Sequence, residues 1–592
     1  MPGPGDRGGV KRKPKDAKGT LIRIIKYLSD YVWIVVILVA LAFLSNIGNL
    51  MGPRLAGKAI GATEAGVGAV DLDVVLHYAI LMLIFYVGGN ILSFLSTIGM
   101  TRVSRRIAQD MRRDVFAKLM KLPVSYFDRN QAGDIISRVS YDIDVVSISI
   151  STDVIHIMTS TVTVVGSFIM MLIISPPLVL CMIFTIPVSI IFTRRMSKKT
   201  RPLYAKRSAS YGVMNGFAEE MFTGQKTILA YANEDNITER FSGINRGAAE
   251  AYRNADSMGM RMGPTIGMIN NFGLAAIGVG GAILYLFKII GLEQISSFVL
   301  YSRKFSGPIN EISNIINEIF SALAAAERVF QLLDEPEEAA DIYGAKVLED
   351  CEGHVEAENV SFGYVPEKTI LHDLNLEAKP GETVAIVGPT GAGKTTIINL
   401  LMRFYDVNSG EIRVEGEESR QYTMQSLRRS FAMVLQDTWV FRGTIYDNIA
   451  YGKEGATMEE VVAAAKAARI HNYIMRLPQG YNTVISEDGG NISKGQKQLL
   501  TIARAMLYNT HMLILDEATS NVDTNTEQQV QKAIRSLMKG KTSFVIAHRL
   551  STIQNADKIL VVDHGDVVEQ GNHETLMAKR GFYYKLYASQ FE

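Results

Sequence analysis

The chain has 592 residues, which is enough for several domains. Its 61 lysine and arginine residues nearly balance its 60 aspartate and glutamate residues, and this excludes a generally basic nucleic-acid-binding protein, so we expect no nucleic-acid partner. Long apolar runs crowd the first half, and charges are spread through the second. This asymmetry predicts a membrane part followed by a soluble part.

A disordered tail and a short interfacial helix are predicted before the first membrane span. Residues 1–18 are rich in Gly, Pro, Lys and Arg, which is typical of a disordered basic tail. Gly19–Asp30 places Leu21, Ile22, Ile25 and Leu28 on one helical face, a pattern that favours a short helix lying in the membrane interface.

Residues 19–333 are predicted to form a transmembrane domain with six helices. Five apolar runs are each long enough to cross about 30 Å of hydrocarbon. These runs are Tyr31–Met51, Val74–Ile98, Val154–Ile174, Pro177–Phe192 and Met262–Phe287. A sixth span begins near Gln294, although Arg303 and Lys304 lie within it. Ionisable residues at this depth usually face a cavity or a partner. Three interpretations stay open: an acidic or amphipathic anionic substrate, paired structural charges, and a wrongly placed span.

The charges between the runs predict the orientation. Basic residues crowd the second and fourth connections, whereas the opposite connections are short and poor in charge; the basic residues are Arg102, Arg105, Arg106, Arg112, Arg113, Arg194, Arg195, Lys198, Lys199 and Arg201. By the positive-inside rule, the N-terminus and the soluble half are cytoplasmic, and the chain is a multi-pass protein of the cell membrane. Cys181 and Cys351 fall in different halves and are not expected to pair, which fits a reducing cytoplasm.

The two long cytoplasmic connections are helically periodic, so we expect the membrane helices to extend through them. Each has a break at its tip, at residues 128–133 in the first and around Phe222-Thr223-Gly224 in the second. A linker is predicted at 334–352. From 353 to 592, short β-rich runs alternate with helices, which predicts an α/β domain on a mostly parallel sheet.

A nucleotide-binding motif dominates this second domain. Thr383–Val387 reads as a buried strand and Thr395–Tyr405 as a helix. The segment between and across them matches G-x-x-x-x-G-K-[ST], and its nucleotide-contacting residues are Gly388, Pro389, Thr390, Gly391, Ala392, Gly393, Lys394, Thr395 and Thr396. Such a turn at a helix N-terminus presents backbone N–H groups to phosphates, with Lys394 reaching the β- and γ-phosphates and Thr395 ligating Mg²⁺. An ordinary glycine-rich turn would lack this flanking strand and helix.

A second strand supplies acidic residues for the same site. The run from Met512 to Asp516 is apolar and ends in the carboxylates of Asp516 and Glu517. We expect Asp516 to hold Mg²⁺ opposite Thr395, and Glu517 to polarise the attacking water as the catalytic base.

Together these features resemble an exporter-type ABC transporter of bacterial kind, a half-transporter in which a membrane α-helical bundle is fused to a P-loop ATPase domain. The segment Asn491-Ile492-Ser493-Lys494-Gly495-Gln496 is similar to the family signature L-S-G-G-Q, with Ile492 and Lys494 departing from it. The resemblance implies that Ser493, Gly495 and Gln496 contact a γ-phosphate.

The resemblance implies further roles and the cofactors ATP and Mg²⁺. Tyr364 is similar to the aromatic residue that stacks on adenine, and Gln436 to the glutamine that senses Mg²⁺ and water. Asp523 matches the acidic position of the D-loop, and His548 resembles the switch histidine that contacts the γ-phosphate, so it joins Glu517 as a catalytic residue.

In this family the P-loop of one domain faces the signature of another, so a chain with one such domain implies a dimer. We favour a heterodimer with a second half-transporter over a homodimer. The segments Leu122–Asp128 and Ala218–Tyr231 resemble the intracellular loops that dock on the ATP domains, the second crossing to the partner chain.

The expected function is ATP-driven export by alternating access, carrying an amphipathic small molecule, a lipid or a peptide. An ATP-gated channel or a membrane-bound regulatory ATPase is the alternative. A soluble ABC ATPase would lack the apolar runs, and an importer would usually keep its membrane and ATP domains on separate chains.

Overall fold

The computed structural model describes residues 16–64, 70–349, 351–435, 438–486, 491–516, 524–547 and 550–591. The chain divides into two compact units. The N-terminal unit comprises Met1–Leu122 and Asn130–Pro336, and the C-terminal unit comprises Pro123–Arg129 and Glu337–Glu592. The predicted basic tail, apart from its last residues, lies outside the described residues.

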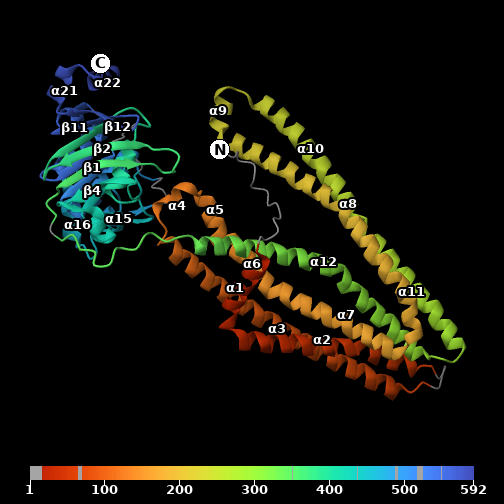
Figure 1. The fold of residues 1–592 in the computed structure, drawn as a ribbon. Coiled ribbons are helices and arrows are strands. Elements are labelled where there is room, and N and C mark those ends of the chain that lie inside the picture. The colour runs from red at the N-terminus through yellow and green to blue at the C-terminus, as the bar shows by residue number, and fades with distance from the viewer. Residues whose placement is uncertain are drawn as a thin grey trace. The chain divides into compact units, whose positions relative to one another are not determined.

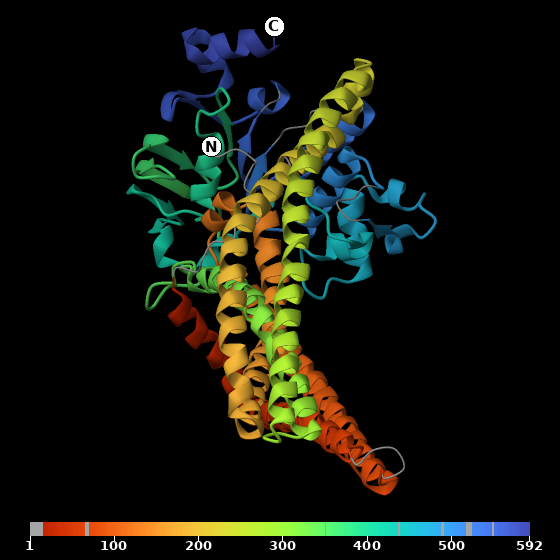
Figure 2. The same ribbon diagram turned by 90° about the vertical axis from the view of Figure 1, so that its right-hand side faces the viewer.

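The N-terminal unit is helical (Figures 1 and 2). Its elements are α1 (Ala17–Ser29), α2 (Val32–Gly61), α3 (Leu72–Leu119), α5 (Ala132–Ser137), η1 (Arg138–Asp142), α6 (Ile143–Ile148), η2 (Ser149–Asp153), α7 (Val154–Ile174), α8 (Pro176–Thr223), α9 (Gln225–Ala230), α10 (Glu234–Met260), α11 (Met262–Leu286) and α12 (Leu292–Asp334). Each predicted span coincides with part of one of these helices, although the first begins one residue before α2 and the fifth ends one residue after α11. The helix α7 matches its predicted run at both ends.

Among the residues that the structure describes, four helical stretches are long and apolar enough to cross a membrane: Val32–Gly61, Leu72–Leu119, Ala132–Ile174 and Glu234–Leu286. The predicted fourth and sixth spans lie in α8 and α12, which are outside this set. The apolar part of α8 is short before Arg194, and α12 carries Arg303 and Lys304. The count of six spans therefore stays a prediction.

The helices continue well past the predicted membrane runs, as their periodicity indicated. The helix α3 extends to Leu119 and α8 to Thr223. The expected breaks lie between α4 (Val124–Arg129) and α5, and between α8 and α9; a further break, not predicted, follows α9. Figure 1 shows α8 and α10 running side by side as a hairpin with α9 at its tip.

The helix α1 is amphipathic and tied to the end of α12. Leu21, Ile22 and Ile25 are exposed on one side, as expected for a helix at a membrane interface. Arg23 forms a two-pronged ion pair with Asp334 and lies over the ring of Phe330. This combination of charge and cation–π contact fixes α1 beside the last turn of α12.

Hydrogen bonds from small polar side chains hold the membrane helices together. Ser45 of α2 donates to the carbonyl of Gly89 in α3 at 2.7 Å, and Ser96 of α3 donates to the carbonyl of Leu38 at 2.8 Å. The amide of Asn46 donates to the carbonyl of Thr159 in α7 at 2.9 Å. Such bonds replace the hydrophobic effect, which does not drive helix association inside lipid.

The structure shows what Lys304 contacts. Pro53 lies inside α2, and because proline has no N–H, the carbonyl four residues earlier, on Asn49, has no helical donor. The Lys304 ammonium of α12 donates to that carbonyl and lies 5.7 Å from the ring centroid of Tyr86. The hydroxyl of Tyr301 donates to the next carbonyl, on Leu50, at 2.6 Å. Lys304 thus has a structural partner, although that partner is a backbone carbonyl and not the opposite charge that one interpretation expected.

The C-terminal unit is an α/β domain. Its elements are α4, β1 (Val355–Phe362), β2 (Leu371–Ala378), β3 (Thr383–Val387), α13 (Lys394–Leu401), β4 (Ser409–Val414), β5 (Glu417–Glu418), η3 (Ser419–Gln421), α14 (Met424–Arg429), β6 (Phe431–Val434), β7 (Gly443–Thr444), α15 (Ile445–Ala450), α16 (Met458–Ala467), α17 (His471–Ile474), η4 (Gly480–Asn482), β8 (Val484–Ile485), α18 (Lys494–Tyr508), β9 (Met512–Asp516), α19 (Thr524–Met538), β10 (Thr542–Ile546), α20 (Leu550–Gln554), β11 (Lys558–Asp563), β12 (Asp566–Gly571), α21 (His573–Lys579) and α22 (Phe582–Phe591).

Its main sheet has the strand order β12-β11-β3-β10-β9-β6. All neighbours are parallel except β11 and β12. Alternate residues of β3 face opposite sides: Ala385 and Val387 join one core, while Val384 and Ile386 join another. A parallel sheet covered on both faces in this way explains the continuous apolar runs that the sequence displays.

A second sheet was not predicted. It is antiparallel, with the order β2-β1-β4-β5. The alternation of buried and exposed residues in β1 and β2 is typical of an antiparallel sheet, but a local pattern does not reveal which strands pair, and the sequence prediction missed it.

Candidate nucleotide site

The predicted phosphate-binding loop lies between β3 and α13, the strand and helix expected on either side of it. Gly391 and Gly393 have φ of 85° and 107°, which a residue with a Cβ rarely adopts. A Cβ on Gly388 would lie 2.0 Å from the carbonyl oxygen of Val562 in β11. Glycine is therefore required here for both conformation and space. The helix α13 ends at Leu401, earlier than the predicted Tyr405, because Arg403 adopts a left-handed conformation with φ of 50°.

Lys394 begins α13 and is nearly buried in the loop. Its ammonium donates to the carbonyls of Gly388 and Pro389 at 2.8 and 3.0 Å. Burial lowers the pKa of Lys394, and the nearby Asp516 carboxylate opposes that change. The ammonium is thus held over the loop by two carbonyl acceptors. Phosphate oxygens are charged acceptors, so they would form stronger hydrogen bonds with this ammonium than the carbonyls do. Thr395 is exposed at the same helix N-terminus, while Thr396 is buried.

The predicted adenine-stacking residue joins this loop. The Tyr364 hydroxyl donates to the Thr396 hydroxyl at 3.3 Å and accepts from the Asn399 amide at 3.0 Å. Its ring packs edge-on against Tyr405, with centroids 4.9 Å apart. Sequence reasoning identified Tyr364 but missed Asn399 and Tyr405, because the polar positions that follow a P-loop lysine carry no motif of their own.

The carboxyl ends of β3, β10, β9 and β6 lie along one edge of the main sheet, because these strands are parallel neighbours. Asp516 ends β9 at that edge, and its register partner in β10 is Ile546. Ligands of open α/β sheets bind outside the carboxyl ends of the strands. Four predicted residues, Gln436, Glu517, Asp523 and His548, lie outside the described residues, so their roles stay predictions.

The predicted signature begins a helix with a capping box. Ser493 is the N-cap of α18: its hydroxyl accepts from the Gln496 N–H at 3.3 Å, and its N–H donates to the Gln496 side chain at 2.9 Å. Gly495 is buried, whereas Lys494 is exposed. The departure at Lys494 leaves the capping intact, and the helix dipole favours an anion at this end.

The tip of the first cytoplasmic loop, Pro123–Arg129, belongs to the same unit as this site. The Tyr405 hydroxyl donates to the Asp128 carboxylate of α4, and the Arg129 guanidinium donates to the Tyr364 carbonyl at 3.5 Å. Burial, followed by the bond to Asp128, raises the pKa of Tyr405, so its hydroxyl keeps its proton. A loop between two membrane helices thus contacts the segment that carries the predicted adenine residue. The fold and site define a membrane-bound P-loop ATPase with both parts on one chain.

Comparisons with known proteins agree with this class. Residues 35–309 match the family model of the ABC transporter transmembrane region, and residues 371–520 match that of the ABC transporter. The chain is 40% identical over 586 residues to an uncharacterized ABC transporter ATP-binding protein, YfiC, of Bacillus subtilis (strain 168), covering 99% of this chain and 96% of that protein.

A second relative and a solved structure extend the comparison. The fatty acid ABC transporter ATP-binding/permease protein of Mycobacterium bovis is 44% identical over 476 residues, which is 80% of this chain and 75% of that protein. The structure of a bacterial Atm1-family ABC exporter with ATP bound aligns with a TM-score of 0.75 at 29% identity, covering 95% of this chain and 99% of that one.

The chain belongs to the ABC transporter family. It is an exporter-type half-transporter that binds ATP and couples ATP hydrolysis to export. It is a multi-pass membrane protein whose ATP-binding domain is cytoplasmic, and it functions as a dimer of half-transporters.

Proposed function

We propose that this half-transporter exports an amphipathic molecule with an acyl chain by alternating access. The relative named as a fatty acid transporter supports this class of substrate, and a lipid or a hydrophobic peptide has the same amphipathic character. ATP would shift the membrane helices toward the outward-facing state because it binds that state more tightly.

The contact between α4 and the nucleotide-binding segment is the observation that carries the coupling. The Tyr405–Asp128 and Arg129–Tyr364 bonds join the loop after α3 to the segment that follows α13 and to the predicted adenine residue. A displacement of Tyr364 on nucleotide binding would therefore be transmitted to α3 and α5 through these two bonds.

We further propose a role for each residue of the nucleotide site. Lys394 binds the β- and γ-phosphates, and Tyr364 stacks on adenine. Mg²⁺ is held by Thr395, Gln436 and Asp516, whose oxygens are the donors that this cation prefers. Glu517 acts as the base, with His548 contacting the γ-phosphate and Asp523 completing the site from the D-loop. The convergence of the carboxyl ends of β3, β10, β9 and β6 supports this arrangement.

The partner half-transporter supplies the signature opposite each P-loop. Two pairs of exposed aromatic residues support an interface. The side chains of Phe222 and Tyr231, on either side of α9, are 78% and 79% exposed, and Trp439 and Tyr451 of the C-terminal unit are 62% and 67% exposed. We propose that α9 docks on this aromatic surface of the partner. A different half-transporter is our preferred partner, and co-purification of a tagged chain from native membranes distinguishes it from a second copy.

Reconstituted liposomes test the function. The measurements are ATP-dependent uptake of a fluorescent fatty acid into inside-out vesicles and ATP hydrolysis in the same vesicles. Tyr405→Phe should lower the uptake per ATP hydrolysed, because it removes the bond to Asp128 without touching the phosphates. Tyr584→Phe is the control, since the described residues offer that hydroxyl no hydrogen bond. Equal uptake per ATP in Tyr405→Phe would refute the coupling role, and uptake without ATP consumption would favour a gated channel.

A further inference from the structure

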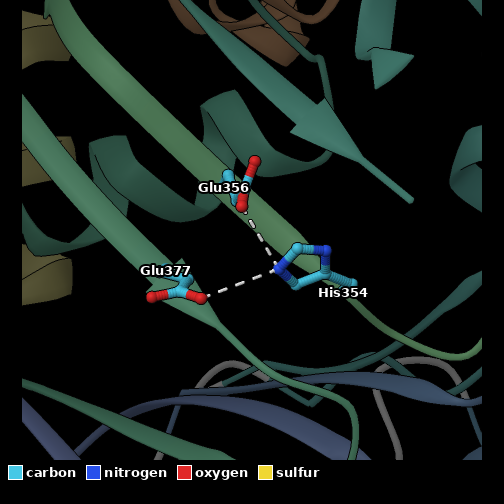
Figure 3. Close-up of side chains that lie close together, drawn as sticks. All are labelled: His354, Glu356 and Glu377. Atoms are coloured by element: carbon cyan, nitrogen blue, oxygen red, sulfur yellow. Dashed lines mark ion pairs between the residues drawn. The ribbon is translucent and has the colours of Figure 1, made fainter. Parts of the chain in front are cut away.

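His354, Glu356 and Glu377 form a cluster of metal-ligating side chains on the antiparallel sheet (Figure 3). His354 immediately precedes β1, and Glu356 lies two residues further on, within β1. Glu377 of β2 is the direct register partner of Glu356. The His354 Nε2 atom lies 3.3 Å from Glu356 Oε1 and 4.0 Å from Glu377 Oε1. Positions two apart on a strand share a face, so all three side chains project to the same side.

The backbone beneath this cluster is held firmly. The Glu415 carboxylate accepts from the N–H groups of Gly353 and His354 at 2.7 and 3.0 Å. The Glu415 N–H in turn donates to the His354 carbonyl at 2.9 Å. Gly353 has φ of 102°, and a Cβ there would lie 2.4 Å from the Thr542 hydroxyl. Position 353, just before His354, therefore requires glycine. Ligands on such supported strands are placed before a metal arrives.

The charges around the cluster favour a cation. Glu356 and Glu377 are like charges directly opposite each other on neighbouring strands, an arrangement that destabilises a sheet. Arg413 lies opposite Glu356 on β4, but its ion pairs are with Glu358 and Glu411. Lys558 forms its ion pair with Glu382, and its ammonium also donates to the backbone carbonyl of Glu377. A divalent cation between the two carboxylates would remove their repulsion.

We propose that His354, Glu356 and Glu377 bind a divalent transition metal of the zinc class. One imidazole nitrogen and two carboxylate oxygens suit Zn²⁺ or Co²⁺ and disfavour Mg²⁺ and Ca²⁺, which take oxygen ligands. Two ligand atoms each about 2.1 Å from a tetrahedral metal lie about 3.4 Å apart. The observed 3.3 Å between His354 Nε2 and Glu356 Oε1 matches that separation, and all three ligand atoms lie within 4.8 Å of one another.

The proposed metal is separate from the nucleotide Mg²⁺, and it would affect the antiparallel sheet that holds it. It would cross-link β1 to β2, and β1 leads to Tyr364 within two residues of its end. Binding to the folded state alone stabilises the domain by mass action. Protons compete for the same donor atoms, so metal affinity should fall on acidification.

The test uses the full-length chain in detergent, carrying an affinity tag without histidine. Co²⁺ is titrated and its visible absorption recorded, because tetrahedral coordination gives an intense band, and Zn²⁺ is then added in competition. Wild type should bind one equivalent, while His354→Ala and Glu377→Gln should each weaken binding at least tenfold. His372→Ala is the matched control, since it removes another histidine from β2 and should leave binding unchanged.

Thermal unfolding with Zn²⁺ or Mg²⁺ supplies a second readout. Zn²⁺ should raise the melting temperature of wild type and of His372→Ala but not of Glu377→Gln, and Mg²⁺ should not reproduce the effect. Glu377→Gln keeps the size of the side chain, so it decides the question if His354→Ala fails to fold. Co²⁺ binding that is absent in wild type, or equal in wild type and Glu377→Gln, would overturn the site.

Discussion

Replacing Lys304 by Met should destabilise the membrane helices through one carbonyl group. Pro53 leaves the Asn49 carbonyl without its helical donor, and the Lys304 ammonium supplies the missing bond. Lys304→Met therefore leaves a carbonyl unpaired where water is scarce. In a Pro53→Ala background, residue 53 has an N–H that can donate to Asn49, so the same substitution should cost much less.

The magnitude follows from general values for such groups. A buried acceptor without a partner costs about 1–3 kcal/mol. Hydrogen bonds between membrane helices measured by double-mutant cycles average about 0.6 kcal/mol and reach about 1.7 kcal/mol. We therefore expect a coupling energy of about 1 kcal/mol between positions 53 and 304. For a unit of roughly 330 residues, that corresponds to about 1–2 °C in melting temperature.

The assay is thermal unfolding in lipid nanodiscs of wild type, both single variants and the double variant. Arg303→Met is the control, because it removes a charge at the same depth from an exposed side chain. An equal loss of melting temperature from Lys304→Met in both backgrounds would refute the reasoning, and so would an equal loss from Arg303→Met.

Three further outcomes are expected. Burial, with the neighbouring Glu415 carboxylate, raises the pKa of the Cys351 thiol to about 12. In a Cys181→Ser background, the alkylation rate of Cys351 should therefore keep rising tenfold per pH unit above pH 9. A plateau of that rate near pH 9 would contradict this prediction. Ser493→Ala should lower ATP turnover while the P-loop still binds ATP. Thr457→Ala removes an equivalent N-cap from α16 at a similar cost of about 1 kcal/mol, and it should leave turnover intact. Equal losses of turnover in the two variants would mean that Ser493 has only a structural role. Gly388→Ala should abolish binding of a fluorescent ATP analogue because its Cβ meets the Val562 carbonyl, while Gly247→Ala, in open space on α10, should not; retained binding in Gly388→Ala would contradict the packing.

The sequence predicted those parts whose cause is local. The strand β3 has its predicted bounds because a short apolar run meets a glycine turn, and α7 has its predicted bounds because an uninterrupted apolar run sets them. The capping at Ser493 was likewise readable from a residue type at a helix start. By contrast, α13 stops early through the backbone conformation of Arg403, which no periodicity reveals.

The rest depends on contacts between distant residues. Lys304 meets a carbonyl 255 positions away, and Tyr405 meets a carboxylate 277 positions away. The pattern around Lys304 marked an unusual charge but held no information about the carbonyl that Pro53 frees. The antiparallel sheet was missed for the same reason, since the pairing of Glu356 with Glu377 is set by the fold and not by either strand alone.

The central claim is that ATP hydrolysis at this site drives movement through the membrane helices. The most direct measurement compares wild type with Glu517→Gln in inside-out vesicles, recording ATP binding, ATP hydrolysis and fatty acid uptake together. We predict that Glu517→Gln retains ATP binding and loses most hydrolysis and uptake in parallel. Undiminished hydrolysis in Glu517→Gln purified without a competent partner, or full uptake without hydrolysis, would contradict the account.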